Sequence, residues 1–70
     1  MSDIVECHSD YTYAERPVAF VWEDRRLEIA KILRQWRSLL GKGFRVKTQD
    51  GQNFELEYLE ESDVWQIHKL

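Results

Sequence analysis

The strongest constraint on the fold is an alternating stretch from residue 43 to residue 58. Apolar or weakly polar side chains recur at every second position on both sides of a polar break, at Phe44, Val46 and Thr48 and then at Phe54, Leu56 and Tyr58. Strict alternation places one set of side chains in a core and the intervening charged set in solvent. The stretch is therefore predicted to be a β-hairpin.

The polar break also determines how the two strands of this hairpin pair. A three-residue loop at 49–51 sets Val46 opposite Phe54 on the apolar face and Arg45 opposite Glu55 on the other. A two-residue loop would instead place Val46 opposite a charge. Because a slip of one residue turns the whole apolar set outward, we expect the three-residue loop, with Gly51 in the left-handed conformation.

Three other segments are predicted to be strands: residues 3–8, 17–22 and 64–68. The second opens on Pro17, which suits the first residue of a strand, and places Val18, Phe20 and Trp22 on the core face. The last carries Trp65 near a sheet edge. Residues 9–16 are expected to form an ordered loop whose tyrosines, Tyr11 and Tyr13, cover the edge of the core.

The segment from Arg25 to Leu40 fits two structures. A helical wheel gathers its large apolar residues on one side, with Asp24 and Gly41 as caps, but leaves Leu27 on the polar side. A strand would continue from a tight turn near Asp24, with a bulge near 30–31 restoring the phase of the apolar residues. Residue patterns alone leave strand and helix open, and Trp36 falls in phase with core residues in both.

Charge is distributed unevenly along the chain. Residues 1–24 carry a net charge of −5, residues 25–47 carry +7 and residues 48–70 carry −5, within an overall charge of −3. A basic middle with interleaved tryptophans suits single-stranded nucleic acid, through phosphate pairing and base stacking. Two features oppose that reading: tryptophans in phase with the core, and acidic ends that are able to fold against the basic block.

Catalytic and metal-site patterns are weak. Cys7, His8 and His68 are too few for a zinc site and lack ligand spacing, and the paired carboxylates belong to solvated faces. We therefore expect no enzyme activity, no cofactor and no metal. A single cysteine and the lack of a long apolar run indicate a cytoplasmic protein that does not enter a membrane.

Several motifs resemble a small uncharacterised bacterial family that reads Pro-x-x-Phe-x-Trp, Val-Leu-x-x-Trp, Tyr-Arg-Val and Trp-x-Leu. The matching residues here are Pro17-x-x-Phe20-x-Trp22, Ile32-Leu33-x-x-Trp36, Phe44-Arg45-Val46 and Trp65-x-Ile67. The half from Phe44 to His68 is also similar to the C-terminal segment of polymerase-like accessory proteins of bacterial mutagenic repair. Glu23-Asp24 departs from the family, whose members place a glycine turn there.

This resemblance covers residues 17–69 and implies a strand for residues 26–36. The expected fold is then mainly β, a small antiparallel sheet or SH3-like barrel of about five strands. The alternative is an α+β domain with a helix at 25–40 packed on the sheet. Residues 1–70 are expected to form one domain, in which residues 1–16 are an N-terminal strand and loop.

The function predicted from the sequence is a non-catalytic interaction module. Its expected partner is a protein, and the resemblance implies docking in bacterial DNA-damage tolerance; the protein itself would be a monomer or a weak homodimer through a sheet edge. The alternative is single-stranded nucleic-acid binding by the basic segment 25–47. The candidate interaction surface comprises Arg25, Arg34, Trp36, Arg37, Arg45, Lys47 and Trp65.

Overall fold

The structure is a computed structural model that describes residues 4–9 and 15–70. Its elements are β1 (Val5–Ser9), β2 (Glu15–Trp22), β3 (Arg25–Arg37), β4 (Gly41–Thr48), β5 (Asn53–Leu59) and β6 (Val64–Lys69). The residues described include no helix, and so none with the length and apolar character to cross a membrane. The strand prediction for residues 26–36 is confirmed, and the helical alternative is wrong.

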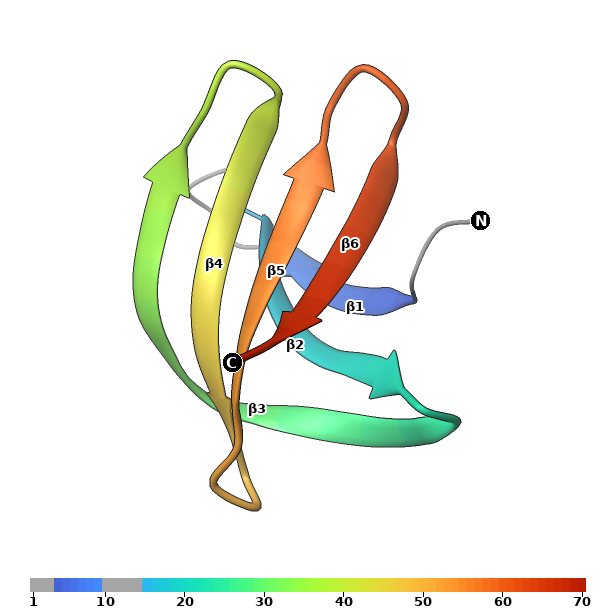
Figure 1. Ribbon diagram of the computed structural model, residues 1–70, viewed down its shortest axis with the longest axis vertical. Coiled ribbons are helices and arrows are strands. Elements are labelled where there is room, and N and C mark those ends of the chain that lie inside the picture. Colours follow the sequence, from blue (N-terminus) through green and yellow to red (C-terminus); the bar gives the residue numbers. More distant parts are fainter. Residues whose placement is uncertain (1–3, 10–14) are drawn as a thin grey trace.

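Each strand pairs antiparallel with the next, in the order β1-β2-β3-β4-β5-β6. Figure 1 shows β4, β5 and β6 in front of β1 and β2, with the long β3 bending from one layer into the other. The described strands therefore form a curled half-barrel. The mainly antiparallel β prediction is confirmed, with six strands among the described residues where about five were expected.

The predicted central hairpin is β4 and β5. Val46 lies opposite Phe54, and Arg45 lies opposite Glu55, as the three-residue loop requires. The Gly51 amide donates to the Thr48 carbonyl oxygen over 3.0 Å, and Gly51 has a φ of 85°. This is the turn with a left-handed glycine that the alternation predicted.

The turn between β2 and β3 consists of Glu23 and Asp24, which sets Trp22 opposite Arg25. Both turn residues have positive φ, 49° and 64°, the geometry of a type I′ turn. This turn matches the right-handed strand twist, and asparagine and glycine usually occupy it. The hairpin forms here without either residue, so the turn carries local strain.

Two bulges give β3 its curvature. The pairing with β4 shifts between Ile29 and Lys31, and shifts again between Ile32 and Arg34. The first bulge, near residues 30–31, confirms the prediction and brings Ile32 opposite Val46 on the core side. The second, at residue 33, was not predicted. Bulges bend a strand and increase its twist, which allows β3 to pair first with β2 and then with β4.

The core lies inside the curled sheet and is built from strand residues that alternate inward. Its buried hydrophobic side chains are Phe20, Leu27, Phe44, Val46, Phe54, Leu56 and Ile67. Trp22 packs against this cluster with its ring edge-on to Phe54, as its phase predicted.

The core assignment of Val18 is wrong, because this residue is 43% exposed. The register between β1 and β2 places Glu6 opposite Ala19 but Cys7 opposite Pro17, and so passes over Val18. Pro17 is buried in its place, inside the strand rather than at its start. Proline is tolerated at such a bulge because its missing N–H is not needed for pairing. The predicted loop with Tyr11 and Tyr13 lies mostly outside the described residues.

Candidate functional site

The second bulge in β3 reverses the face on which Trp36 lies. Ile32 pairs with Val46 on the core side, whereas Trp36 pairs with Gly43, one position away from the inward Phe44. Because successive residues of a strand alternate between faces, the indole lies on the outer surface of the sheet. The prediction that Trp36 is in phase with the core is therefore wrong, and the bulge at residue 33 is the reason.

Gly43 provides the place where this indole rests. A Cβ at Gly43 would lie 2.3 Å from Cε2 of Trp36, 2.4 Å from Cζ2 and 2.5 Å from Nε1. No side chain larger than hydrogen fits under the ring, so the indole packs directly on the β4 backbone. Trp36 is half-buried, which leaves part of the ring accessible to a ligand.

Positively charged side chains extend from this indole along the outer surface of β3 and β4. Lys31 lies opposite Lys47, and Arg34 lies opposite Arg45, so two cross-strand pairs carry like charges. We call the surface formed by Lys31, Arg34, Trp36, Arg45 and Lys47 the cationic face. Like charges directly opposite one another destabilise a sheet. In this protein the two like-charge pairs share a face with the accessible indole of Trp36.

The acidic ends of the chain neutralise part of the basic middle, as the sequence suggested they could. Arg26 donates to both oxygens of Glu6, at 2.7 and 2.9 Å, and this contact lowers the pKa of the Glu6 carboxyl. Arg37 contacts Glu60 at 3.3 Å. Lys31, Arg34 and Lys47 form no ion pair within residues 4–9 and 15–70. These ion pairs therefore leave most of the positive charge on the cationic face without a neutralising partner among the described residues.

A shallow depression of about 310 Å³ opens within the cationic face. Its lining comes from three neighbouring strands: Arg34 and Trp36 on β3, Arg45 on β4 and Glu55 on β5. Arg45 Nη2 donates to Glu55 Oε1 over 3.0 Å. The depression thus combines one aromatic wall, two guanidinium groups and a single carboxylate.

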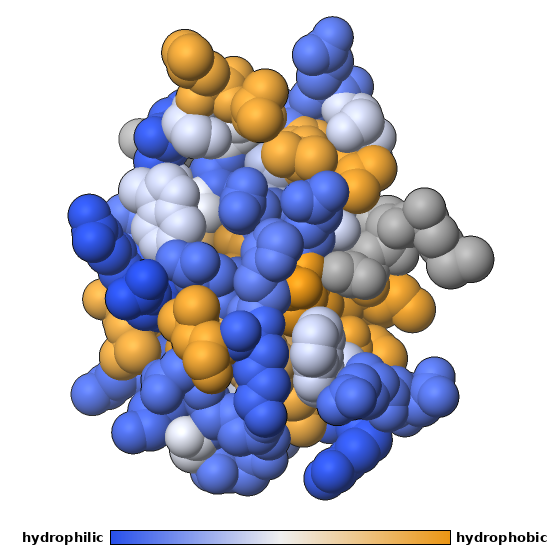
Figure 2. Space-filling model, in the orientation of Figure 1, coloured by the Kyte–Doolittle hydropathy of each residue, from blue (hydrophilic) through white to orange (hydrophobic). Residues whose placement is uncertain are grey.

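The wider surface around the depression is hydrophilic. Figure 2 shows the outer side of the front strands, β4 to β6, covered mostly by hydrophilic residues. Hydrophobic side chains protrude at the upper left, over the turn between β3 and β4, where Leu39 and Leu40 are exposed. The depression therefore lies on a polar surface, and the apolar turn is separate from it.

Four residues of the predicted interaction surface are brought together in the cationic face, and three are not. Arg25 lies beside the β2–β3 turn, in a hollow shared with Gln49 and Asp50. Arg37 follows Trp36 and lies on the opposite side of β3. The half-buried Trp65 packs on Phe44 and Tyr58 at the inner side of the edge strand β6.

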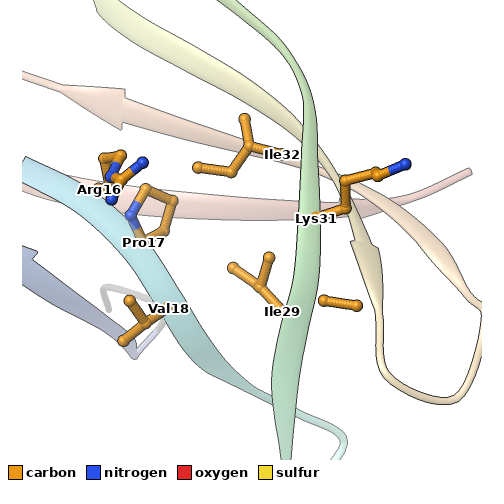
Figure 3. A pocket seen from close by; sticks show the side chains of 7 residues that line it. Arg16, Pro17, Val18, Ile29, Lys31 and Ile32 are labelled. Atoms are coloured by element: carbon orange, nitrogen blue, oxygen red, sulfur yellow. The ribbon is translucent and has the colours of Figure 1, made fainter.

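A second hollow, of about 350 Å³, lies where β2 and β3 separate after their last pair. Its lining residues are Arg16, Pro17, Val18, Ile29, Ala30, Lys31 and Ile32. Figure 3 shows Pro17, Ile29 and Ile32 directed into this space, whereas the Lys31 side chain extends on the other side of β3. The lining of this hollow mixes apolar side chains with polar surface, so it does not point to one class of ligand. Within the part of the chain that the structure describes, no three His, Cys, Asp or Glu side chains form a metal site.

Sequence reasoning missed Gly43, Glu55 and Lys31 as members of the candidate site. A glycine inside a predicted strand is itself a signal, because it often marks the close approach of another group. Lys31 and Glu55 gave no such signal, since their positions depend on the register of β3 against β4 and β5. No protein-family model, curated protein or solved structure matches the chain.

Proposed function

We propose that the protein is a small non-catalytic module that binds single-stranded nucleic acid on the cationic face. The observation that carries the proposal is Trp36 lying on the outer surface over Gly43, with Arg34 and Arg45 in the next cross-strand pair. Aromatic rings stack on bases of any sequence, and neighbouring guanidinium and ammonium groups neutralise phosphates.

The spacing of the cations supports the same ligand. Residues two apart on one face of a strand lie about 7 Å apart, so Arg45 and Lys47 repeat along β4 at a distance close to one extended nucleotide. Arg34 and Lys31 flank them on β3. A single strand that runs along β3 and β4 would relieve the repulsion within both like-charge pairs.

Protein docking is the competing proposal, including a role in bacterial DNA-damage tolerance drawn from the sequence resemblance. The SH3-like barrel that the resemblance implies belongs to that proposal too, and the curled antiparallel sheet supports it. The exposed Leu39 and Leu40 at the β3–β4 turn are its best structural support, because apolar side chains at a loop tip suit a protein partner. Nucleic acid is favoured because Lys31, Arg34 and Lys47 form no ion pair within residues 4–9 and 15–70 and lie on the same face as an accessible indole.

The test is fluorescence anisotropy with labelled single-stranded DNA and RNA dodecamers at low and moderate salt. We expect micromolar binding at low salt and a log–log salt slope of about −2 to −3, from three or four phosphate contacts. Arg34→Glu should weaken binding about tenfold or more. Arg37→Glu is the matched control, because Arg37 lies on the other side of the same strand and contacts Glu60. It should change binding by less than about threefold.

Absence of binding at the lowest salt would overturn the proposal, because screening of charges is weakest there. Equal losses for Arg34→Glu and Arg37→Glu would also count against it, since they would indicate a response to net charge alone. Either result would direct the search to protein partners.

A further inference from the structure

The charges that line the depression on the cationic face are distributed asymmetrically, and this distribution determines which base the depression can bind. Glu55 is the one acidic residue in its lining, and Arg34, Arg45 and Glu55 form a continuous row across β3, β4 and β5. Positive charge therefore lies on the β3 and β4 side, and negative charge on the β5 side.

This asymmetry fixes the direction in which a bound nucleotide lies. Phosphates are attracted to the β3 and β4 side and repelled from Glu55. A base attached to such a phosphate extends across Trp36 toward β5. The edge of the base then meets the Arg45–Glu55 pair.

We infer that this depression recognises guanine, an inference that rests on the proposed nucleic-acid function. Arg45 offers N–H donors directly beside the acceptor oxygens of Glu55, and the two groups are 3.0 Å apart. The Watson–Crick edge of guanine presents the complementary order, an O6 acceptor followed by the N1–H and N2–H donors. Arginine donates to O6, and the carboxylate accepts from N1–H and N2–H.

No other base satisfies all of these groups. Adenine and cytosine each present one amino donor next to an acceptor, so they can pair with Arg45 and with only one oxygen of Glu55. Uracil or thymine presents a single N–H between two carbonyl oxygens, and the second carbonyl would face the other oxygen of Glu55. Each base therefore loses at least one hydrogen bond that guanine makes. Glu55 is ready for this contact, because only its Oε1 atom accepts a hydrogen bond within residues 4–9 and 15–70.

The experiment uses the full chain and oligouridine dodecamers that carry one central guanosine, adenosine, cytidine or inosine. Guanosine should bind about tenfold more tightly than adenosine or cytidine, as expected for one bidentate base contact. Inosine keeps N1–H but lacks the N2 amino group, so its affinity should lie between those of guanosine and adenosine. Glu55→Gln should bring guanosine and adenosine within about twofold of each other.

Glu57→Gln is the matched control, since it removes the same charge one position further along the outer side of β5. It should leave the preference for guanosine unchanged. If the native protein binds all four oligonucleotides equally, the guanine inference is overturned while nucleic-acid binding stands. A guanosine preference that survives Glu55→Gln also overturns it. If no oligonucleotide binds, the proposed function fails as well.

Discussion

Gly43→Ala tests the packing of Trp36 more directly than any other substitution. The new Cβ would lie 2.3–2.5 Å from three indole atoms. Favourable carbon contacts begin near 3.5 Å, so the ring has to move by about 1.2 Å or rotate away into solvent. Forcing a methyl group into such a contact costs about 1–3 kcal/mol.

Part of that cost is offset, because alanine is favoured over glycine inside a strand by about 0.5–1 kcal/mol. The net expectation is a loss of up to about 2.5 kcal/mol in the free energy of unfolding, measured by urea denaturation. A domain of this size should lose up to about 20 °C in Tm for such a change. Binding of single-stranded oligonucleotides should weaken about fivefold or more, since stacking on one aromatic ring contributes about 1–3 kcal/mol.

A double-mutant cycle separates the contact with Trp36 from other effects of the methyl group. In a Trp36→Ala background the same Gly43→Ala change meets no indole and should be neutral or stabilising by up to about 1 kcal/mol. If Gly43→Ala destabilises both backgrounds equally, the indole does not rest on Gly43. If it stabilises the native chain and leaves binding intact, the outer-surface placement of Trp36 is refuted.

Three shorter predictions follow from the turn, one ion pair and one like-charge pair. Glu23→Asn with Asp24→Gly should raise Tm by about 2–8 °C by removing left-handed strain. The same Asn-Gly pair in place of Leu39 and Leu40 in the β3–β4 turn, where neither residue has a positive φ, should give no gain. Arg26 lowers the pKa of Glu6, so this contact contributes stability above the usual carboxyl pKa and loses it as pH falls. Glu6→Gln should therefore destabilise near pH 7, and melting curves of variant and native chains should converge as the pH falls through the lowered carboxyl pKa; a constant difference would contradict the ion pair. Lys47→Glu should raise stability by about 0.2–1 kcal/mol in thermal melts while weakening oligonucleotide binding, and parallel losses of both would contradict the cross-strand repulsion.

The parts of the fold that follow from local patterns were predictable from the sequence. The β4–β5 hairpin has strict alternation on both strands and a glycine where the turn needs one, so its register follows from nearby residues alone. The β2–β3 hairpin was harder, because Glu23 and Asp24 do not have the usual preference for positive φ. The strand and helix readings of β3 differ little locally, and pairing with both β2 and β4 decides between them.

The placement of the candidate site depended on features that no local pattern contains. The bulge at residue 33 shifts the register of β3 against β4, and it places Trp36 on the face opposite to Ile32. Composition identified the right types of residue, since Arg34, Arg45 and Lys47 belong to the cationic face. Arg37 has the same chemistry as Arg34 but lies on the other side of the strand and contacts Glu60, so it is not part of the cationic face.

The cationic face is a place where the chain gives up stability. The adjacent β4–β5 ladder shows the stabilising alternative to a like-charge pair, because Arg45 and Glu55 lie opposite each other there and form an ion pair. Lys31 opposite Lys47 lacks that compensation, and each exposed like-charge pair costs on the order of a few tenths of a kcal/mol. Solubility alone does not need this arrangement, since alternating signs keep a surface equally hydrated. A polyanion removes the repulsion when it binds, so the same residues that weaken the free domain strengthen the complex, and this coupling favours a ligand with regularly spaced negative charges.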